Sequence, residues 1–404
     1  MLSLLKKLQL RFPPILLLLS LLSAFPPLAT DMYLPALPSL QEQWHTSFGT
    51  VNLTLVAFFL GYCFFLLIYG PLSDYFGRRP PLLVGIAIFV AASLFCAFSD
   101  GVVLMIIGRF LQGTGASSAS AIVFAISKDR FAGTMRQKIF VQIGAIVAAA
   151  PLLAPVLGGW LLKYMSWRWI FLIQSMLAIV AFVGVWRMQE SLPEKSSLGL
   201  NVVFHRYVSL LYTRGFVRLL FIFTLTCIPL FAFIGGSADI YMHVFGFSAQ
   251  RYGYFFGLNA SALLLAPALF NKIVKRIGAK NIITLSMSGM VISSFLMIFS
   301  WLPEPWRLTF PMFCFTFCFG LSRPVGNNLI LEEVEEHAGA ASSLMVFFYF
   351  MTGSLSMRFL ANEWQDKVQM LGLLGGLSAG LALLLWFFIG KRMTRKVAEQ
   401  QVAQ

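Results

Sequence analysis

The chain has 404 residues, of which 58% are hydrophobic and 11% are charged, and its mean hydropathy is +0.80. Soluble globular proteins are about half apolar and about a quarter charged, so this composition excludes a soluble protein and indicates one that crosses a membrane many times. The formal net charge of +14 is spread over segments between apolar spans and forms no patch with interleaved aromatic residues, so it indicates topology and no nucleic-acid partner.

Apolar windows of about 20 residues, the length that a helix needs to cross a hydrocarbon core, predict the membrane spans. There are twelve of them, at residues 12–37, 50–72, 80–98, 102–126, 138–163, 168–188, 216–243, 250–272, 280–301, 306–331, 340–360 and 367–390. The segments between them carry far more Lys and Arg on one side than on the other. By the positive-inside rule, both termini are expected in the cytoplasm.

The first window follows Lys6, Lys7 and Arg11, an order that also fits a secretory signal peptide. The window is long, lacks an obvious cleavage site between small residues, and is followed by further spans. We therefore interpret it as the first span.

The longest polar interval lies between the sixth and seventh windows. The sequence therefore predicts an all-α membrane protein with twelve transmembrane helices in two six-helix bundles. The expected division is an N-terminal bundle over residues 1–190, a cytoplasmic linker over 191–215, a C-terminal bundle over 216–390 and a cytoplasmic tail over 391–404.

Asp31 places a carboxylate inside the first apolar window. A charged side chain at the centre of a bilayer costs roughly 2.5 to 3.5 kcal/mol on insertion scales, so such residues usually face a protein interior or a watery cavity and carry protons or ions. We therefore expect Asp31 to be a proton site, and the chain to be a carrier organised around it.

The segment GPLSDYFGRR at residues 70–79 follows the second window. Its two glycines allow tight turning, and its Asp and Arg residues lie at a helix end where charges can pair. An ordinary basic turn is the alternative interpretation. The spacing resembles the signature loop of the major facilitator superfamily.

Two further segments extend this resemblance. RFLQGTG at residues 109–115 is similar to the fourth-helix motif of the superfamily, although its arginine also fits a side chain that reaches for the membrane interface. Residues 144–159 resemble the fifth-helix motif of the exporters, with Ala154 where a glycine often precedes the second proline. Generic packing of small residues is the alternative for this helix.

With TDMYLPALP at residues 30–38 and WRWIF at 167–171, the chain resembles the bicyclomycin and chloramphenicol resistance group of drug:proton antiporters. The resemblance is clear over residues 12–190. It is thinner in the second half, where GLNA at 257–260 and AGAAS at 338–342 still match.

The resemblance implies a major facilitator fold, a location in a bacterial inner membrane and a role for each matching residue. Asp31 and Arg109 fall on the positions that couple transport to protons. The cytoplasmic gate would comprise Gly70, Asp74, Gly77, Arg78, Arg79 and Asp129, with Asp74 docking on the start of the eleventh helix at residues 339–342. Gln112, Gly113 and Gly115 belong to the fourth-helix motif, and Pro151, Pro155, Gly158 and Gly159 to a hinge in the fifth helix. Candidate substrate-lining residues are Thr30, Tyr33, Gln142, Asp239 and Asn259.

Some features match no known role. Arg323 and Arg358 are further charges near the tenth and eleventh spans. Asp239 is either a second titrating group or a solvated residue at the outer end of its span. The Phe-rich runs at residues 313–319 and 347–350 fit either the floor of a drug cavity or ordinary helix packing.

The implied activity is proton-coupled efflux of drugs or other small amphipathic molecules by alternating access. The partners would be a small-molecule substrate, the proton and membrane lipid, and the protein is expected to be a monomer. Export of an endogenous metabolite such as a siderophore, sugar or peptide is the alternative, because an aromatic cavity does not identify its cargo.

Enzyme chemistry is not expected. The four histidines, His45, His205, His243 and His337, lack metal-ligand spacing, and all five cysteines lie in apolar segments. The sequence contains neither a nucleophile motif nor an ATP-binding loop. We therefore expect no catalytic residue, metal or cofactor, with the proton gradient as the energy source; binding or sensing without turnover is the remaining alternative.

Overall fold

The computed structural model describes residues 14–193, 200–299, 302–334 and 338–402, and these ranges contain helices and no strand. Within them, twelve helices or helix groups are long and apolar enough to cross a membrane. The predicted all-α membrane architecture with twelve spans is therefore confirmed.

The first span is built from short pieces, and the next five are single helices. In order they are α2 (Pro14–Ser23), α3 (Phe25–Asp31), η1 (Leu34–Ala36) and α4 (Leu37–Gln43), then α5 (Phe48–Phe76), α6 (Arg79–Ala97), α7 (Val102–Arg130), α8 (Gly133–Tyr164) and α9 (Arg168–Arg187).

The second set of six spans follows helix α10 (Leu200–Tyr212), which lies in the predicted linker. Its members are α11 (Arg214–Leu225), α12 (Cys227–Ala238) and the π-helical turn η2 (Asp239–Val244), then α13 (Ala249–Ile277), α14 (Ala279–Ile298), α15 (Trp306–Glu332), α16 (Ala338–Leu360) and α17 (Lys367–Val402). Helix α17 continues through most of the segment expected as a tail.

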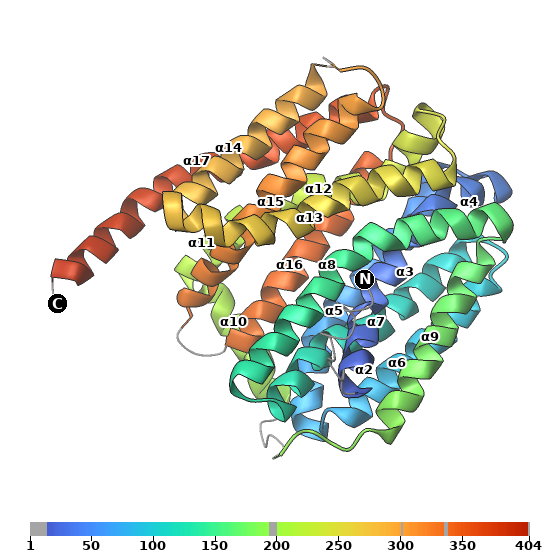
Figure 1. Cartoon of the computed structure of the whole chain (residues 1–404), viewed down its shortest axis with the longest axis horizontal. Helices are drawn as coiled ribbons and strands as arrows, with labels where there is room; N and C mark the ends of the chain where they lie inside the picture. The colour runs from blue at the N-terminus through green and yellow to red at the C-terminus, as the bar shows by residue number, and fades with distance from the viewer. Residues whose placement is uncertain (1–13, 194–199, 300–301, 335–337, 403–404) are drawn as a thin grey trace, which may run out of the picture.

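The two sets of helices lie side by side, and we call them the first and second halves. In Figure 1 the first half, from α2 to α9, is coloured blue to green, and the second half, from α11 to α17, yellow-green to red. Helix α8 packs along α13 and α5 packs along α16, so these two pairs join the halves. Apolar side chains from both halves share one core cluster.

The two ends of the helix bundle are named here for later use. The basic end holds the turn at Gly77 between α5 and α6 and the start of α16. The far end holds the start of α5 at Phe48 and the end of η2 at Val244. By the positive-inside rule, the basic end corresponds to the side on which both termini were predicted.

The first span differs from its prediction as an unbroken window over residues 12–37. It continues to Gln43 and is interrupted after Asp31, where α3 ends. Prolines at positions 26, 27, 35 and 38 remove backbone N–H donors along this stretch, which explains why the helix breaks into pieces. The break places the Asp31 carboxylate at the middle of the span.

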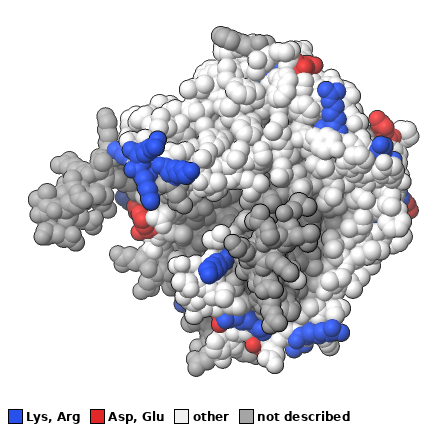
Figure 2. Space-filling view, viewed as in Figure 1, with Lys and Arg blue, Asp and Glu red and all other residues white. Residues whose placement is uncertain are grey.

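The outer surface suits a lipid environment. Figure 2 shows that most of one face of the molecule carries neither acidic nor basic side chains. Large apolar side chains are strongly exposed on the surface of the molecule, among them those of Leu377, Val141 and Trp186. Exposed apolar area on this scale, on helices of spanning length, is what a bilayer covers.

Candidate functional site

A central cavity of about 610 Å³ lies between the two halves. It begins near Asp31, in the middle of the first span, and extends to Gly339 and Ser343 near the start of α16 at the basic end. Helices α2, α3, α5, α7 and α8 of the first half and α12 and α16 of the second contribute its wall. Pockets of 300–1,000 Å³ hold drug-sized molecules, so this cavity is the candidate binding site.

An aromatic cluster closes the inner part of the cavity. Phe59 and Tyr62 from α5 meet Phe231 from α12 and Phe350 from α16, with ring centroids 5.0 to 5.7 Å apart. The cluster therefore joins the halves and gives the cavity an apolar lining. Of the Phe-rich runs, Phe350 belongs to this wall, whereas residues 313–319 do not line the cavity.

Asp31 lies on this wall with 6% of its surface exposed. The hydroxyl of Thr30 donates a hydrogen bond of 2.9 Å to its Oδ1 atom. Among the residues described as lining the cavity, Asp31 is the only Asp, Glu, Lys, Arg or His. The expected proton site and the candidate binding site therefore coincide in space.

Arg109 is completely buried behind the cavity. Its Nη1 atom donates to the backbone oxygen of Ala29 at 2.9 Å and to the side-chain oxygen of Gln112. The guanidinium lies over the rings of Tyr33 and Phe58, at 4.7 and 4.5 Å from their centroids. Cation–π contacts of this kind stabilise a charge away from water.

Arg109 and Asp31 form no ion pair in the part of the chain that the structure describes. Arg109 instead contacts the Ala29 carbonyl, two residues before Asp31, from the other side of the first span. Any influence of one charge on the other therefore acts through the position of this helix and through space, without direct contact.

Gln112 extends the arginine's contacts into a buried network. Its amide nitrogen donates to Ser93 Oγ and to Gln174 Oε1, both at 2.8 Å, and Gln174 donates to the Leu28 backbone oxygen at 3.0 Å. Four spans thus meet at one set of hydrogen bonds. Sequence reasoning singled out Gln112 but missed Ser93 and Gln174, since nothing in their local sequence marks them.

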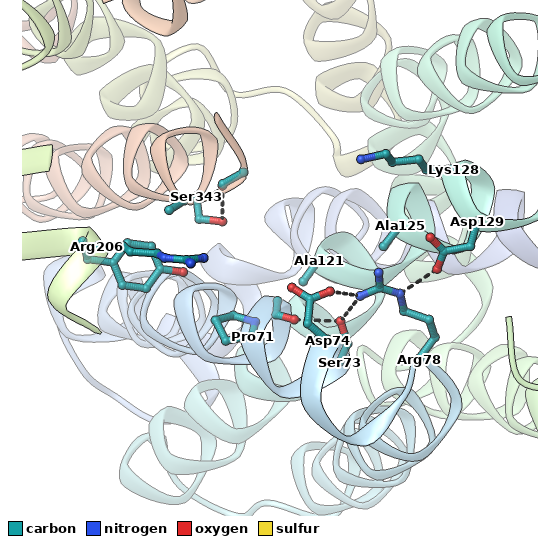
Figure 3. Close-up of a pocket in the computed structure, with 14 residues that line it drawn as sticks. Pro71, Ser73, Asp74, Arg78, Ala121, Ala125, Lys128, Asp129, Arg206 and Ser343 are labelled. Carbon is teal, nitrogen blue, oxygen red and sulfur yellow. Dashed lines mark hydrogen bonds and ion pairs between the residues drawn. The ribbon is translucent and has the colours of Figure 1, made fainter. Parts of the chain in front are cut away.

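The residues predicted for the gate come together at the basic end. Arg78 donates from Nε to Asp129 at 2.8 Å and from Nη1 to Ser73 at 2.9 Å and to Asp74 (Figure 3). Burial alone would lower the pKa of Arg78, but the two carboxylates raise it above its ordinary value. Arg78 is therefore a permanent cation in this cluster.

A second cavity of about 400 Å³ separates this cluster from α16. Figure 3 shows Asp74 on one side of it and Arg206 from α10 and Ser343 from α16 on the other. The docking of Asp74 on the start of α16, implied by the resemblance, is not formed among the described residues. The side chain of Asp74 is instead 54% exposed. This cavity and the central cavity share Gly339 and Ser343, so the molecule is hollowed toward the basic end.

Glu190 is a further member of this cluster that sequence reasoning missed. Its carboxylate accepts hydrogen bonds from the backbone N–H groups of Arg78 at 2.9 Å and Arg79 at 3.1 Å, where α6 begins. It also accepts from the N–H groups of Ser191 and Leu192. Burial alone would raise the pKa of Glu190, but these four donors lower it below the ordinary value.

The predicted glycines of α7 and α8 lie where helices approach closely. A Cβ atom at Gly113 would overlap the backbone oxygen of Phe58, and one at Gly115 would lie 2.5 Å from the backbone nitrogen of Phe89. On α8, Gly158 faces the backbone of Met32, and Gly159 that of Ala249 in the second half. Pro151 lines the central cavity, whereas Pro155 is buried near α13.

Of the five residues predicted to line a substrate site, only Thr30 lines the central cavity. Tyr33 is fully buried against Arg109. Asn259 is buried and accepts a hydrogen bond from Thr316 at 3.0 Å, and Gln142 is half-buried on α8 outside the cavity.

Asp239 corrects two expectations. It is not solvated, because only 8% of its side chain is exposed. It forms an ion pair with Lys367, and its Oδ1 atom lies 2.7 Å from Nδ1 of His243. It also lies in a different cavity, at the far end, so its candidate role in lining the substrate site is not supported.

Arg323 and Arg358 have local partners. Arg323 donates to the Phe223 backbone oxygen at 3.2 Å and to Cys227 Sγ at 2.7 Å, and it lies over the ring of Phe319. Arg358 donates to Asn362 at 2.6 Å. Neither residue lines the central cavity.

Comparisons with known proteins agree with this architecture. An uncharacterized MFS-type transporter of Bacillus subtilis, YdgK, is 32% identical over 350 residues, or 84% of this chain and 86% of the relative. The bicyclomycin resistance protein homolog of Haemophilus influenzae is 25% identical over 385 residues, covering 93% of this chain and 96% of the relative.

A crystal structure of a D-xylose-proton symporter has the same fold. It superposes with a TM-score of 0.74 at 17% identity, covering 91% of this chain and 96% of that one. Residues 19–357 match the family described as the Major Facilitator Superfamily, which is most of the chain. The protein is thus a multi-pass membrane transporter that belongs to the Major Facilitator Superfamily.

Proposed function

We propose that this protein exports small amphipathic molecules, drugs among them, from the cytoplasm in exchange for protons. The observation that carries the proposal is the position of Asp31: one buried carboxylate, with no basic neighbour on the wall, inside an apolar cavity of drug size. The similarity to a relative named as a bicyclomycin resistance protein homolog supports a drug as one cargo.

Coupling would follow from competition at Asp31. A charged carboxylate in an apolar cavity is costly, so the site favours either a proton on Asp31 or a bound molecule that offers a polar group to it. Because the proton and the cargo stabilise the same group, loading one releases the other. The cavity would open alternately to the two sides as the halves rock about this midplane site.

The hollowed basic end would be the cytoplasmic side, with both termini there. The proton gradient of a bacterial inner membrane would supply the energy. A membrane potential contributes about 2.3 kcal/mol per charge per 100 mV, so exchange of a neutral cargo for one proton is driven by both the potential and the pH difference. One chain carries all the groups this cycle uses, so we propose a monomer as the working unit.

The test uses everted membrane vesicles that contain the full chain, with a fluorescent dye reporting the internal pH. Addition of bicyclomycin, and then of a panel of amphipathic antibiotics, should release protons from vesicles with the wild-type protein. Asp31→Asn should abolish that release and the resistance of cells that express the protein. Asp100→Asn is the control, because Asp100 lies in a loop with 86% of its side chain exposed. Undiminished proton release by Asp31→Asn would refute the proposal.

A further inference from the structure

A buried amide bonds the two halves to each other at the far end. Asn52 is the fifth residue of α5, and none of its surface is exposed. Its Nδ2 atom donates a hydrogen bond of 2.8 Å to the backbone oxygen of Gly235 on α12, in the second half of the molecule. This hydrogen bond therefore crosses the interface between the two halves. It must break when the halves separate at the far end.

The structure of the seventh span explains why the Gly235 oxygen accepts this bond. In an uninterrupted α-helix, the N–H of Asp239 would bond to the Gly235 oxygen four residues earlier. Here α12 gives way to the π-helical turn η2, and the Asp239 N–H bonds to Gly236 instead. The Gly235 oxygen thereby loses its donor within the helix. The side-chain N–H of Asn52, from the first half, takes its place.

The same turn provides a second link between the halves. Asp239 holds Lys367 in an ion pair in which only 8% and 11% of the two side chains are exposed. The Lys367 Nζ atom lies 5.2 Å from the ring centroid of Phe48, which is one helical turn before Asn52 on α5. A cation held over an aromatic ring is attracted to it, so Asp239 positions a lysine that binds the opposite half.

If position 52 served only for packing, an apolar side chain would stabilise the protein more than an amide does. The Asn52 Oδ1 atom is buried and has no hydrogen-bond partner among the described residues. A buried polar atom without a partner costs free energy that an apolar side chain of similar size would not. The amide is therefore better explained by a contact that must form and break than by the stability of one closed state.

We propose that Asn52 and Lys367 are the positioning residues that hold the far end closed. In this arrangement Asn52 binds Gly235 directly, and Lys367 is held by Asp239 against Phe48. Gly235 and Asp239 are four residues apart on the seventh span, so a movement of the end of α12 and of η2 away from α5 breaks both contacts together. The inference rests on the proposed alternating-access function, and it names the contacts that the cycle must break on the side opposite the central cavity.

The test measures distances across both ends of the full-length protein in lipid nanodiscs by spin-label spectroscopy. The five cysteines are replaced by serine. The label pairs are Glu42→Cys with Glu363→Cys across the far end and Thr134→Cys with Lys275→Cys across the basic end, because each pair joins exposed residues of opposite halves. The two populations of each distance are compared between variants.

Asn52→Leu should increase the population with a long far-end distance by about fivefold, the factor expected for one hydrogen bond of ordinary net strength. The basic-end distance should shorten in the same fraction of molecules. Lys367→Met acts on the second link near the surface and should shift the populations in the same direction. It keeps the inference testable if Asn52→Leu fails to fold.

Thr54→Val is the matched control. Thr54 is also fully buried on α5, but its hydroxyl bonds to Tyr33 at 2.9 Å and to the Val51 oxygen, both within the first half. It should lower thermal stability and leave both distance populations as in the wild type. If Thr54→Val moves the populations as far as Asn52→Leu does, the role of Asn52 is only structural and the inference is wrong.

Two further outcomes separate this inference from the proposed function. If Asn52→Leu and Lys367→Met both keep the wild-type populations while Asp31→Asn abolishes proton release, the far-end contacts named here are wrong and proton-coupled export stands. If the two variants shift the populations but Asp31→Asn still releases protons, the contacts are correct and the proposed coupling is wrong. Kinetics give a second readout, because a change in the balance of states alters the turnover rate and the apparent KM together.

Discussion

The backbone N–H of Arg78 donates a hydrogen bond of 2.9 Å to the carboxylate of Glu190, 112 residues later in the chain. Glu190 thereby accepts from the first N–H groups of α6 and holds the end of the sixth span against the turn between the second and third spans. A carboxylate at a helix N-terminus satisfies unpaired donors and interacts favourably with the helix dipole.

Replacing Glu190 by alanine should destabilise the protein by about 1 kcal/mol, the usual effect of losing a helix cap. Thermal unfolding of the detergent-solubilised protein measures the change. The effect should depend on pH, because the pKa of Glu190 in the folded protein is below its ordinary value of 4.5. The stabilisation is fully present above that value and is lost as the pH falls through the folded-state pKa. The Tm difference between wild type and variant should therefore be constant near pH 7 and vanish in acid; a difference that grows in acid would contradict this account.

Gly77→Ala, in the turn between α5 and α6, should lower the free energy of unfolding by roughly 1 to 3 kcal/mol, the cost of a strained backbone position. Gly77 has φ of +101°, and an added Cβ atom would lie 2.6 Å from Glu190 Oε2. Gly101→Ala is the control, since Gly101 has φ of −164° and no atom within 4 Å of an added Cβ. Equal melting temperatures for the two variants would show that the turn tolerates a side chain.

Gly113→Ala should separate α5 from α7 and lower stability by roughly 1 to 3 kcal/mol, as overpacking in a dense core does. The added methyl group would overlap the Phe58 backbone oxygen, which cannot move without shifting its helix. Gly144→Ala on α8 adds the same group in open space and should leave the Tm unchanged. A thermal shift assay of both purified variants measures the two Tm values. A wild-type Tm for Gly113→Ala would count against the close approach of α5 and α7 at Gly113.

Gln112→Leu should cost roughly 1 to 3 kcal/mol, because it leaves Arg109 and Gln174 with buried groups that lose a partner. Gln174→Leu alone should cost less, since Gln112 keeps its bond to Ser93. The double variant should cost less than the sum of the single variants, because residues of one network are not independent. Additive changes in thermal stability would mean that the two amides do not act together.

Much of this protein follows from its sequence. Hydropathy is enough to predict twelve spans, since a helix must present about 20 apolar residues to cross a bilayer. The resemblance to the signature loop of the superfamily grouped Asp74 and Arg78, which are four residues apart around the turn between α5 and α6, with Asp129, and the structure brings the three together. Asp31 was recognised because a carboxylate in an apolar window is unusual wherever the helix happens to face.

Other relationships were decided only by the tertiary structure. The sequence does not show that Glu190 caps α6, that Asn52 binds Gly235, or that Lys367 pairs with Asp239 and keeps it from water. Each of these contacts joins residues more than 100 positions apart. Whether such residues meet depends on where proline breaks a span and how far each helix is rotated, and an apolar window averages over all the faces of a helix. The sequence therefore determined which segments enter the membrane, whereas helix packing decided which of their polar groups meet inside it.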